Sequence, residues 1–195
     1  EFAWLALPSL ALSALRDLSE ARQRNALRYW LRPLTPMPDS EHWAGWQALR
    51  DAAVDAAPLW RLAAGELRRS DQRLWWLAGD WLRSPAAPKI TIPGGQSMVL
   101  PGNGSVRIDG VLPAGAWQLD YRRAGDQLQV LGRGHRDLKR LFNELRVPVF
   151  VRDRLPLMRL DGRVVAVANL PGLQGAHDGS WQLNWQPPTS DQGLS

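Results

Sequence analysis

A segment rich in proline and glycine in the middle of the chain most limits which folds the chain can adopt. Residues 84–104 hold eight proline and glycine residues, which interrupt helices and strands. This segment is therefore expected to be a linker or loop with at most short strands. A chain of 195 residues is long enough for one large domain or two small ones. We therefore predict two small domains, at residues 1–83 and 105–195, joined by residues 84–104.

The two halves differ in composition and charge. Eight of the eleven Trp residues lie at or before Trp81. The first 83 residues carry a formal charge of +1, and the remainder carries +4. Hydrophobic residues make up 45% of the chain, which is enough to build a core and excludes wholesale disorder. We expect a Trp-rich domain followed by a more basic one.

Two helices are predicted in the first half. Ser19 can cap a helix that runs to about Arg32, and Ser40 can cap a second helix that runs to about Val54. Apolar residues at helical spacing mark the buried sides of both helices. These residues are Leu27, Trp30, Leu31, Trp43, Trp46, Leu49 and Ala53.

A small meander of strands is predicted after Pro58, at residues 59–63, 66–70 and 73–78. Trp75 and Trp76 would face opposite ways on such a strand, so one of them is expected at the surface. The second half is mostly β, with one helix from His135 to Leu145 and a type I′ hairpin at Asp161-Gly162. Its strands are predicted at 105–109, 116–122, 126–131, 155–160, 163–167 and 180–186. The predicted fold class is α+β: a small helix-rich domain with a short strand meander, then a mostly β domain with one basic helix.

Positive charge is concentrated in residues 132–159. This stretch holds eight basic and three acidic residues, so its net charge of +5 equals that of the whole chain. Gly132 and Gly134 precede the predicted helix and would leave backbone N–H groups near its positive end, an arrangement that suits phosphate oxygens. The alternative is a solvated basic helix face without a ligand. A second basic stripe, Arg24, Arg28 and Arg32, is either paired to acids elsewhere or directed at phosphates.

Several other functions are excluded or disfavoured by the sequence. The chain has no Cys, so disulfides, thiolate nucleophiles and Cys-based metal sites are excluded. Its three His residues are far apart, so no metal site is expected. No GK[ST] loop or GxSxG elbow is present. The apolar segment from Phe2 to Leu15 is too short to span a bilayer and lacks a basic leader. We therefore expect a cytoplasmic protein that does not associate with a membrane. Because the chain starts without Met, we expect it to be cut from a longer protein.

A longer motif with unusual spacing runs through the basic stretch. It comprises Gly132-Arg133, Arg136, Leu138-Lys139, Phe142, Glu144, Val147-Pro148, Arg152-Asp153 and Pro156-Leu157. Weaker matches lie upstream, at residues 27–31, 36–38, 68–69 and 74–76. In these residues nearly the whole chain resembles the C-terminal portion of the bacterial tRNA(Ile)-lysidine synthase family. Phe150 stands where the family usually has Trp, which keeps an aromatic ring and loses an indole N–H.

The resemblance implies a role in tRNA recognition without catalysis. The family's catalytic N-terminal domain has a Ser-Gly-Gly-x-Asp-Ser loop, which this sequence does not contain. With ATP, lysine and magnesium, the parent enzyme converts the wobble cytidine of CAU-anticodon tRNA(Ile) to lysidine. The domains represented here would grip the tRNA acceptor stem and hold no cofactor. The implied partners are that tRNA, the catalytic domain and a second copy of the parent enzyme.

Site residues follow from the basic stretch and the resemblance together, since duplex RNA is read mostly through shape, phosphates and 2′-hydroxyls. The expected phosphate contacts are Arg133, Arg136, Lys139, Arg140, Arg152 and Arg154. A second set of expected contacts is Arg122, Arg123, Arg28, Arg32, Arg68 and Arg69. Supporting roles are expected for Phe150, Asp153 and Glu144, the two acids orienting arginines.

Two other functions compete with tRNA recognition. In one, the chain is a protein-interaction module whose basic helix docks on an acidic surface such as that of the catalytic domain. In the other, it is a carbohydrate-binding module that uses its Trp residues, which would require export.

Overall fold

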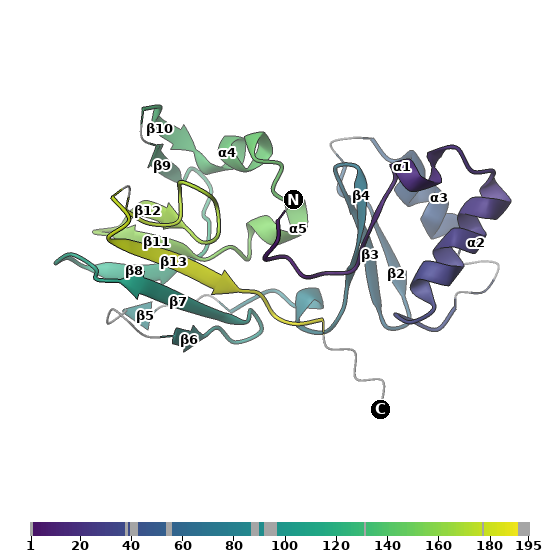
Figure 1. Cartoon of the computed structure of the whole chain (residues 1–195), viewed down its shortest axis with the longest axis horizontal. Coiled ribbons are helices and arrows are strands. Elements are labelled where there is room, and N and C mark those ends of the chain that lie inside the picture. The colour runs from purple at the N-terminus through teal and green to yellow at the C-terminus, as the bar shows by residue number, and fades with distance from the viewer. Residues whose placement is uncertain are drawn as a thin grey trace. The chain divides into compact units, whose positions relative to one another are not determined.

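A computed structural model of the chain gives an α+β fold in two compact units (Figure 1). The structure describes residues 2–37, 39, 43–53, 56–86, 90–91, 97–130, 132–176 and 178–190. We call residues 6–83 the helical unit, and residues 84–188 together with 2–5 the β unit. Each unit is described by itself.

In its described residues, the helical unit packs three helices and the 3-10 helix η2 with one antiparallel sheet of strand order β1-β4-β3-β2. The helices are α1 (Ser13–Arg16), α2 (Glu20–Leu31), α3 (Ala44–Asp51) and the 3-10 helix η2 (Gly79–Leu82). The strands are β1 (Ser9–Ala11), β2 (Leu59–Leu62), β3 (Gly65–Ser70) and β4 (Arg73–Leu77). The predicted meander is thus confirmed, and β1 adds a fourth strand by pairing with β4.

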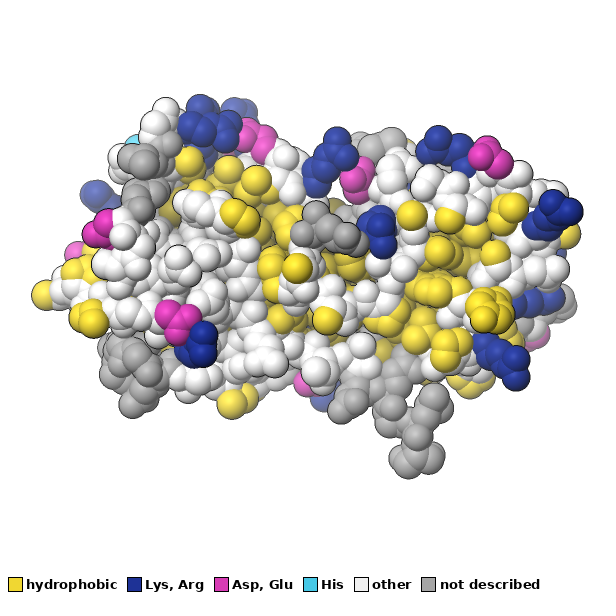
Figure 2. Space-filling view, viewed as in Figure 1, with side chains coloured by type: hydrophobic (Ala, Val, Ile, Leu, Met, Phe, Trp, Pro, Cys, Tyr) yellow, Lys and Arg dark blue, Asp and Glu magenta, His cyan; other side chains and the backbone are white. Residues whose placement is uncertain are grey.

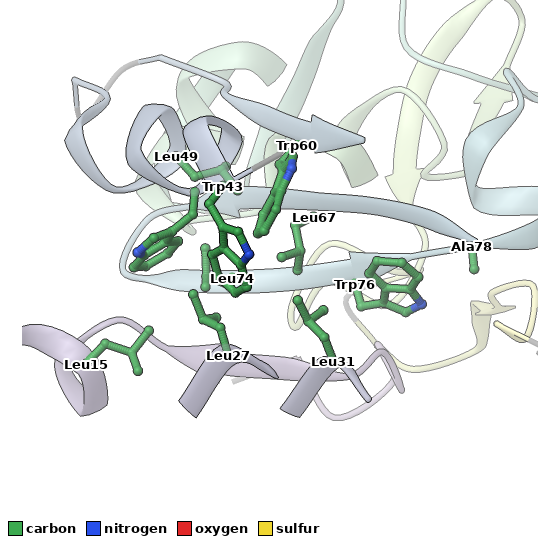
Figure 3. Close-up of a cluster of buried hydrophobic side chains, with 11 residues drawn as sticks. Leu15, Leu27, Leu31, Trp43, Leu49, Trp60, Leu67, Leu74, Trp76 and Ala78 are labelled. Atoms are coloured by element: carbon green, nitrogen blue, oxygen red, sulfur yellow. The ribbon is translucent and has the colours of Figure 1, made fainter. Parts of the chain in front are cut away.

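The core of the helical unit lies between the helices and the sheet (Figure 3). Leu27 and Leu31 of α2 and Trp46 of α3 are at most 1% exposed, and they pack with Leu67 and Leu74 of the sheet. The 3.6-residue spacing of α2 therefore did mark its buried side.

Three details of the helical unit differ from the predictions. Helix α3 begins after Trp43 and ends at Asp51, and Ala53 beyond its end is exposed; Ser40 lies outside the described residues. Ser19 does occupy the cap position of α2, but its side chain makes no capping hydrogen bond. Trp75 and Trp76 are both buried, so neither lies at the surface, and the guanidinium of Arg73 lies 5.7 Å from the Trp75 ring centroid.

The β unit contains two larger antiparallel sheets and a two-stranded ribbon, with orders β12-β11-β8-β5, β13-β7-β6 and β10-β9. Its strands are β5 (Ile90–Thr91), β6 (Ser97–Val99), β7 (Ser105–Gly110), β8 (Trp117–Asp120), β9 (Gln127–Val130), β10 (Gly134–Asp137), β11 (Leu157–Leu160), β12 (Arg163–Val167) and β13 (Trp181–Gln186). Its helices are α4 (Leu138–Glu144) and α5 (Val149–Arg152).

The turn between β11 and β12 has the geometry that its sequence predicted. Asp161 and Gly162 have φ angles of 49° and 80°, and a type I′ turn needs positive φ at both central residues. The segment 84–104, in contrast, does more than link the halves. Strands β5 and β6 pair with β8 and β7, and Asn103 is fully buried, so this segment is built into the β unit.

None of the helices described is both long enough and apolar enough to cross a lipid bilayer.

Candidate nucleic-acid interface

Several of the predicted site residues of the β unit lie on the β9–β10 ribbon and on α4, which follows β10 directly (Figure 1). The predicted helix from His135 to Leu145 is wrong in its first turn. Residues 134–137 pair with β9 as a strand, and the helix begins only at Leu138. Leu138, Leu141 and Phe142 are buried as the helical spacing predicted, so α4 presents its other face to solvent.

The glycines before α4 shape a turn rather than a phosphate cradle. Gly132, in the connection from β9 to β10, and Gly134, the first residue of β10, have φ angles of 71° and 68°, a conformation that glycine adopts without a Cβ penalty. The N-terminus of α4 is also occupied, because the Asp137 carboxylate accepts a hydrogen bond of 3.0 Å from the Arg140 backbone N–H. The predicted phosphate site on free backbone N–H groups is therefore wrong, and any anion binding here depends on side chains.

Three predicted site residues form an exposed, unneutralised group. Arg136 lies on β10, while Lys139 and Arg140 lie on the first turn of α4, and all three side chains are exposed. Within the part of the chain that the structure describes, none of the three forms an ion pair with an acid. Figure 2 shows Lys and Arg side chains gathered over this part of the β unit. We call Arg136, Lys139 and Arg140 the basic surface.

Other predicted arginines of the β unit are held by carboxylates. Arg133 Nη2 lies 2.9 Å from Glu144 Oε2, and Arg122 Nη2 lies 2.9 Å from Asp153 Oδ1. Arg123 pairs with Asp120. The two acids that were expected to orient arginines, Glu144 and Asp153, are thus each in contact with one. The side chains of Arg133 and Arg123 remain exposed, and that of Arg122 is partly accessible.

Arg152 is half-buried and fixed in place. Its Nε donates to the Val147 carbonyl at 2.8 Å, and its Nη1 donates to Asn143 Oδ1 at 2.6 Å. Burial lowers the pKa of Arg152, and the nearby positive charge of Arg122 lowers it further, while Asp153 opposes both effects. The charges of Arg122 and Arg152 therefore repel each other, and Asp153, the ion-pair partner of Arg122, partly offsets this repulsion.

Arg154 is a structural residue, in contrast to the prediction. It is only 5% exposed, and its Nη1 donates to the Gly102 carbonyl and to Asn103 Oδ1 at 3.1 and 3.3 Å. A phosphate could reach this guanidinium only if the core opened. Phe150, the aromatic residue of α5, is half-buried.

The arginines of the second expected set that lie in the helical unit have distinct roles. Arg28 lies over the ring of Trp43, with Cζ 5.3 Å from the centroid, and Arg68 donates to Glu66 at 2.8 Å. Arg69 Nη1 donates to three carbonyls at the end of α3, so Arg69 caps that helix. Arg32 is exposed and has no ion-pair partner among the described residues. Arg24, in the same stripe, pairs with Glu20 at 2.6 Å.

Sequence reasoning also missed the role of Arg159 inside the basic stretch. Arg159 is 4% exposed and donates to Asp120 and Asp126 at 2.7–3.0 Å. Leu157, Arg159 and Asp161 are spaced two residues apart. This spacing gave no signal that Arg159 is buried, since a charged residue on a strand is normally placed on the exposed face. Across the described residues, no group of three or more His, Asp or Glu side chains could hold a metal ion.

Two models of one protein family match the chain, one in each unit. Residues 10–75 match the TilS substrate binding domain, and residues 117–185 match the TilS substrate C-terminal domain. The first match lies within the helical unit and the second within the β unit.

The curated relatives give the family. The chain is 55% identical over 192 residues to the tRNA(Ile)-lysidine synthase of Pseudomonas aeruginosa, with 98% of the chain and 43% of the relative covered. It is 53% identical over 194 residues to that of Pseudomonas fluorescens, with 100% and 44% covered, and 36% identical over 178 residues to that of Alkalilimnicola ehrlichii, with 84% and 39% covered. The chain belongs to the tRNA(Ile)-lysidine synthase family, and it spans less than half the length of these relatives.

A solved structure of a TilS C-terminal domain is also similar, with 22% identity, 51% of this chain and 98% of that chain covered, and a TM-score of 0.39. This overlap is too loose to add to the fold described above.

Proposed function

We propose that this chain is the tRNA-gripping part of a tRNA(Ile)-lysidine synthase, and that its basic surface contacts phosphates of the acceptor stem of CAU-anticodon tRNA(Ile). The observation that carries the proposal is the group Arg136, Lys139 and Arg140, which is exposed and has no acidic partner in the described part of the chain. Three exposed like charges on one short ribbon and helix turn repel one another, and a polyanion removes that repulsion.

The arrangement of these cations suits binding to duplex RNA better than sequence-specific recognition of bases. The cations stand on a rigid ribbon and a capped helix turn, and a duplex RNA stem is recognised through its backbone and 2′-hydroxyls. Arg133, Arg122 and Arg152 lie in the same stretch or its neighbourhood and would extend the contact, with Glu144 and Asp153 fixing two of them. The chemistry of the whole enzyme, which would consume ATP and lysine with magnesium, lies in the part of the relatives that this chain does not match.

Salt dependence of binding tests the proposal. With roughly four phosphate contacts, the logarithm of the affinity for tRNA(Ile) should fall with the logarithm of salt concentration with a slope of about −3. The variant Arg136→Gln/Lys139→Gln/Arg140→Gln should bind about tenfold or more weakly and show a slope shallower by about two. The charge-matched control is Arg61→Gln/Arg107→Gln/Arg163→Gln, three exposed arginines outside the basic surface. Equal losses in the two variants would refute the proposed surface.

A protein-docking function is the second candidate, because exposed apolar side chains lie beside the basic helix. Leu145 follows α4 and is 38% exposed, and Val149 begins α5 and is 44% exposed. If the catalytic domain docks on α4, adding that domain in trans should protect the α4 amides from hydrogen exchange while tRNA leaves them unchanged. Protection by tRNA without the catalytic domain supports the tRNA contact instead.

A further inference from the structure

The outward side of helix α2 is a second charged surface, which the functions proposed above do not use. Its side chains lie within about a third of the helix circumference, since successive residues of an α-helix are turned by roughly 100°. All of them are exposed, whereas the opposite side of α2 packs on the core of the helical unit. We call this surface the outer face of α2; its residues are Arg22, Asn25, Arg28, Tyr29 and Arg32.

The outer face of α2 carries three positive charges and no negative charge. Arg22, Arg28 and Arg32 form no ion pair within the described residues. Glu20, the only acid of α2, is paired with Arg24 outside this face. Figure 2 shows Lys and Arg side chains along the edge of the helical unit that α2 forms in Figure 1. A solvated protein surface normally mixes charges of both signs, so three unneutralised arginines on one helix face favour an anionic partner.

Arg28 is held in place by an aromatic ring instead of a carboxylate. Its Cζ lies 5.3 Å from the ring centroid of Trp43, and Trp43 is 2% exposed and belongs to the core. A cation–π contact of this kind orients the guanidinium and leaves its positive charge uncancelled. Arg28 is therefore positioned for an anion without being neutralised by the protein.

Tyr29 places an exposed ring among these cations. It is 83% exposed, more than any other large hydrophobic residue that the structure describes. A single exposed aromatic residue is ordinary on a protein surface. Here, however, the ring shares one helix face with three unpaired arginines, and cations that follow the phosphates beside a ring on which bases stack are the two groups with which proteins hold single-stranded nucleic acid. Bases within a duplex stack on one another, so a free ring suits an unpaired base.

From this face we propose that α2 binds an unpaired stretch of the tRNA, with its phosphates on Arg22, Arg28 and Arg32 and one base stacked on the Tyr29 ring. The proposal rests on the tRNA-binding function proposed above, and it adds a contact in the helical unit to the basic surface of the β unit. Helix α2 lies within residues 10–75, which match the TilS substrate binding domain. An acidic protein segment would pair with the arginines, but it would give the exposed ring no stacking partner.

Fluorine nuclear magnetic resonance tests the contact directly, because the chain has only two Tyr residues. Labelling with 3-fluorotyrosine therefore gives one resonance for Tyr29 and one for Tyr121, which is 8% exposed and serves as an internal control. The Tyr29 resonance, assigned by its loss in Tyr29→Phe, should shift on titration with single-stranded octauridylate at low salt. It should stay nearly in place with a blunt-ended RNA duplex of the same length. Equal shifts with strand and duplex, or no shift with either, would overturn the proposal.

The affinity for tRNA separates the role of the ring from that of the charges. Tyr29→Ala should weaken binding at least about fivefold and leave the salt dependence unchanged, because it removes a stacking contact and no phosphate contact. Tyr29→Phe keeps the ring and should bind within about twofold of the unchanged chain. A Tyr29→Ala variant that binds as tightly as Tyr29→Phe would contradict base stacking.

The arginines should behave in the opposite way. Arg22→Gln/Arg32→Gln should weaken tRNA binding and make the slope of log affinity against log salt concentration shallower by about 1.5. The charge-matched control is Arg61→Gln/Arg163→Gln, two exposed arginines on other elements, which should change the slope much less. Equal changes in the two double variants would contradict phosphate binding at the outer face of α2.

Further arms of the test separate RNA from an acidic protein and this contact from the proposed function. If a polyglutamate peptide shifts the Tyr29 resonance as far as octauridylate does, the face is a general polyanion surface and the assignment to RNA is overturned. If tRNA leaves Tyr29 in place while the basic-surface variant still loses tRNA binding, the contact fails and the proposed function stands without it. If tRNA shifts Tyr29 while the basic-surface variant binds normally, the contact stands and the proposed basic surface fails.

Discussion

Arg159 and Asp126 form a doubly hydrogen-bonded ion pair inside the β unit. Arg159 Nη1 donates to Asp126 Oδ1 at 3.0 Å, and Nη2 donates to Asp126 Oδ2 at 2.7 Å. Asp120 accepts a third bond from Nε at 2.9 Å. The pair joins β11 to the turn before β9, so a residue from the most basic stretch of the chain serves the core.

Removing the charge of Asp126 should therefore destabilise the β unit. Asp126→Asn leaves a buried guanidinium with one carboxylate instead of two, and breaking a buried pair in this way costs about 3 kcal/mol. Urea unfolding followed by far-UV circular dichroism measures the change. The control is Asp153→Asn, which removes an exposed partner of Arg122 and should cost no more than about 0.5 kcal/mol. Equal stability of the two variants would contradict a structural role for the Arg159–Asp126 pair.

The same pair predicts how stability depends on pH. Burial raises the pKa of Asp126, but hydrogen bonds from Arg159 and from the Arg123 backbone N–H outweigh it and hold the pKa below its ordinary value of 3.8. A carboxyl with a lowered pKa in the folded state binds fewer protons than in the unfolded chain, so its stabilisation is present above pH 4 and is lost as the pH falls further. Unfolding of Asp126→Asn at pH 7 and pH 3 should therefore show a smaller acid-induced loss than the unchanged chain. An identical loss in both proteins would show that Asp126 does not titrate with folding.

Asn103 should be as important to stability as a large core residue. Its Nδ2 donates to Tyr121 Oη and to the Arg154 carbonyl, both at 2.8 Å, and its Oδ1 accepts from Arg154 Nη1 at 3.3 Å. Asn103→Ala strands buried partners on several elements, which should cost about 3 kcal/mol in chemical unfolding. Asn143→Ala removes an amide from the exposed face of α4 and should change the free energy of unfolding by about 1 kcal/mol or less. Similar values for the two would refute the buried network.

Arg69 should contribute to stability through the geometry of its guanidinium. One nitrogen serves three carbonyls at the end of α3, where a helix leaves backbone acceptors unpaired. Arg69→Lys keeps the charge but has a shorter side chain, which moves the donor nitrogen away from these carbonyls, and should lower the stability of the helical unit by about 1 kcal/mol. Arg68→Lys, next along β3, alters only an ion pair with Glu66 and should be nearly neutral. A neutral Arg69→Lys variant would show that the cap adds nothing.

Much of the architecture was predictable because local patterns agreed with the tertiary fold. The spacing of Leu27 and Leu31 marked the buried side of α2. The dipeptide Asp161-Gly162 was sufficient by itself to predict the turn between β11 and β12. Strand β1 was missed because its three residues, Ser9–Ala11, acquire a strand conformation only by pairing with β4, more than sixty residues away. Helix α4 was extended backwards because His135 and Arg136 continue its polar face, although pairing with β9 decides their conformation.

The site was harder to predict than the fold, because charge in a sequence does not reveal burial. Arg136, Arg154 and Arg159 lie within 24 residues of one another and look alike as sequence, yet the first is exposed and the other two are in the core. What separates them is the position of carboxylates and carbonyls that come from distant segments, Asp126 for Arg159 and residues 102–103 for Arg154.

Variants of the cap of α4 can test separately how the position of Lys139 and Arg140 and the local charge contribute to tRNA binding. Asp137 Oδ1 accepts the Arg140 N–H, which fixes the helix turn that carries Lys139 and Arg140. Asp137→Asn keeps a side chain that caps well but removes a negative charge beside the basic surface, so stability should hold and tRNA should bind about twofold more tightly. Asp137→Ala removes the same charge and also the cap, which should cost about 1 kcal/mol of stability and loosen the helix turn. Fluorescence anisotropy with labelled tRNA should therefore show weaker binding by the Ala variant than by the Asn variant, although both carry the same net charge. Equal affinities would show that charge alone, without a fixed geometry, accounts for binding at this surface.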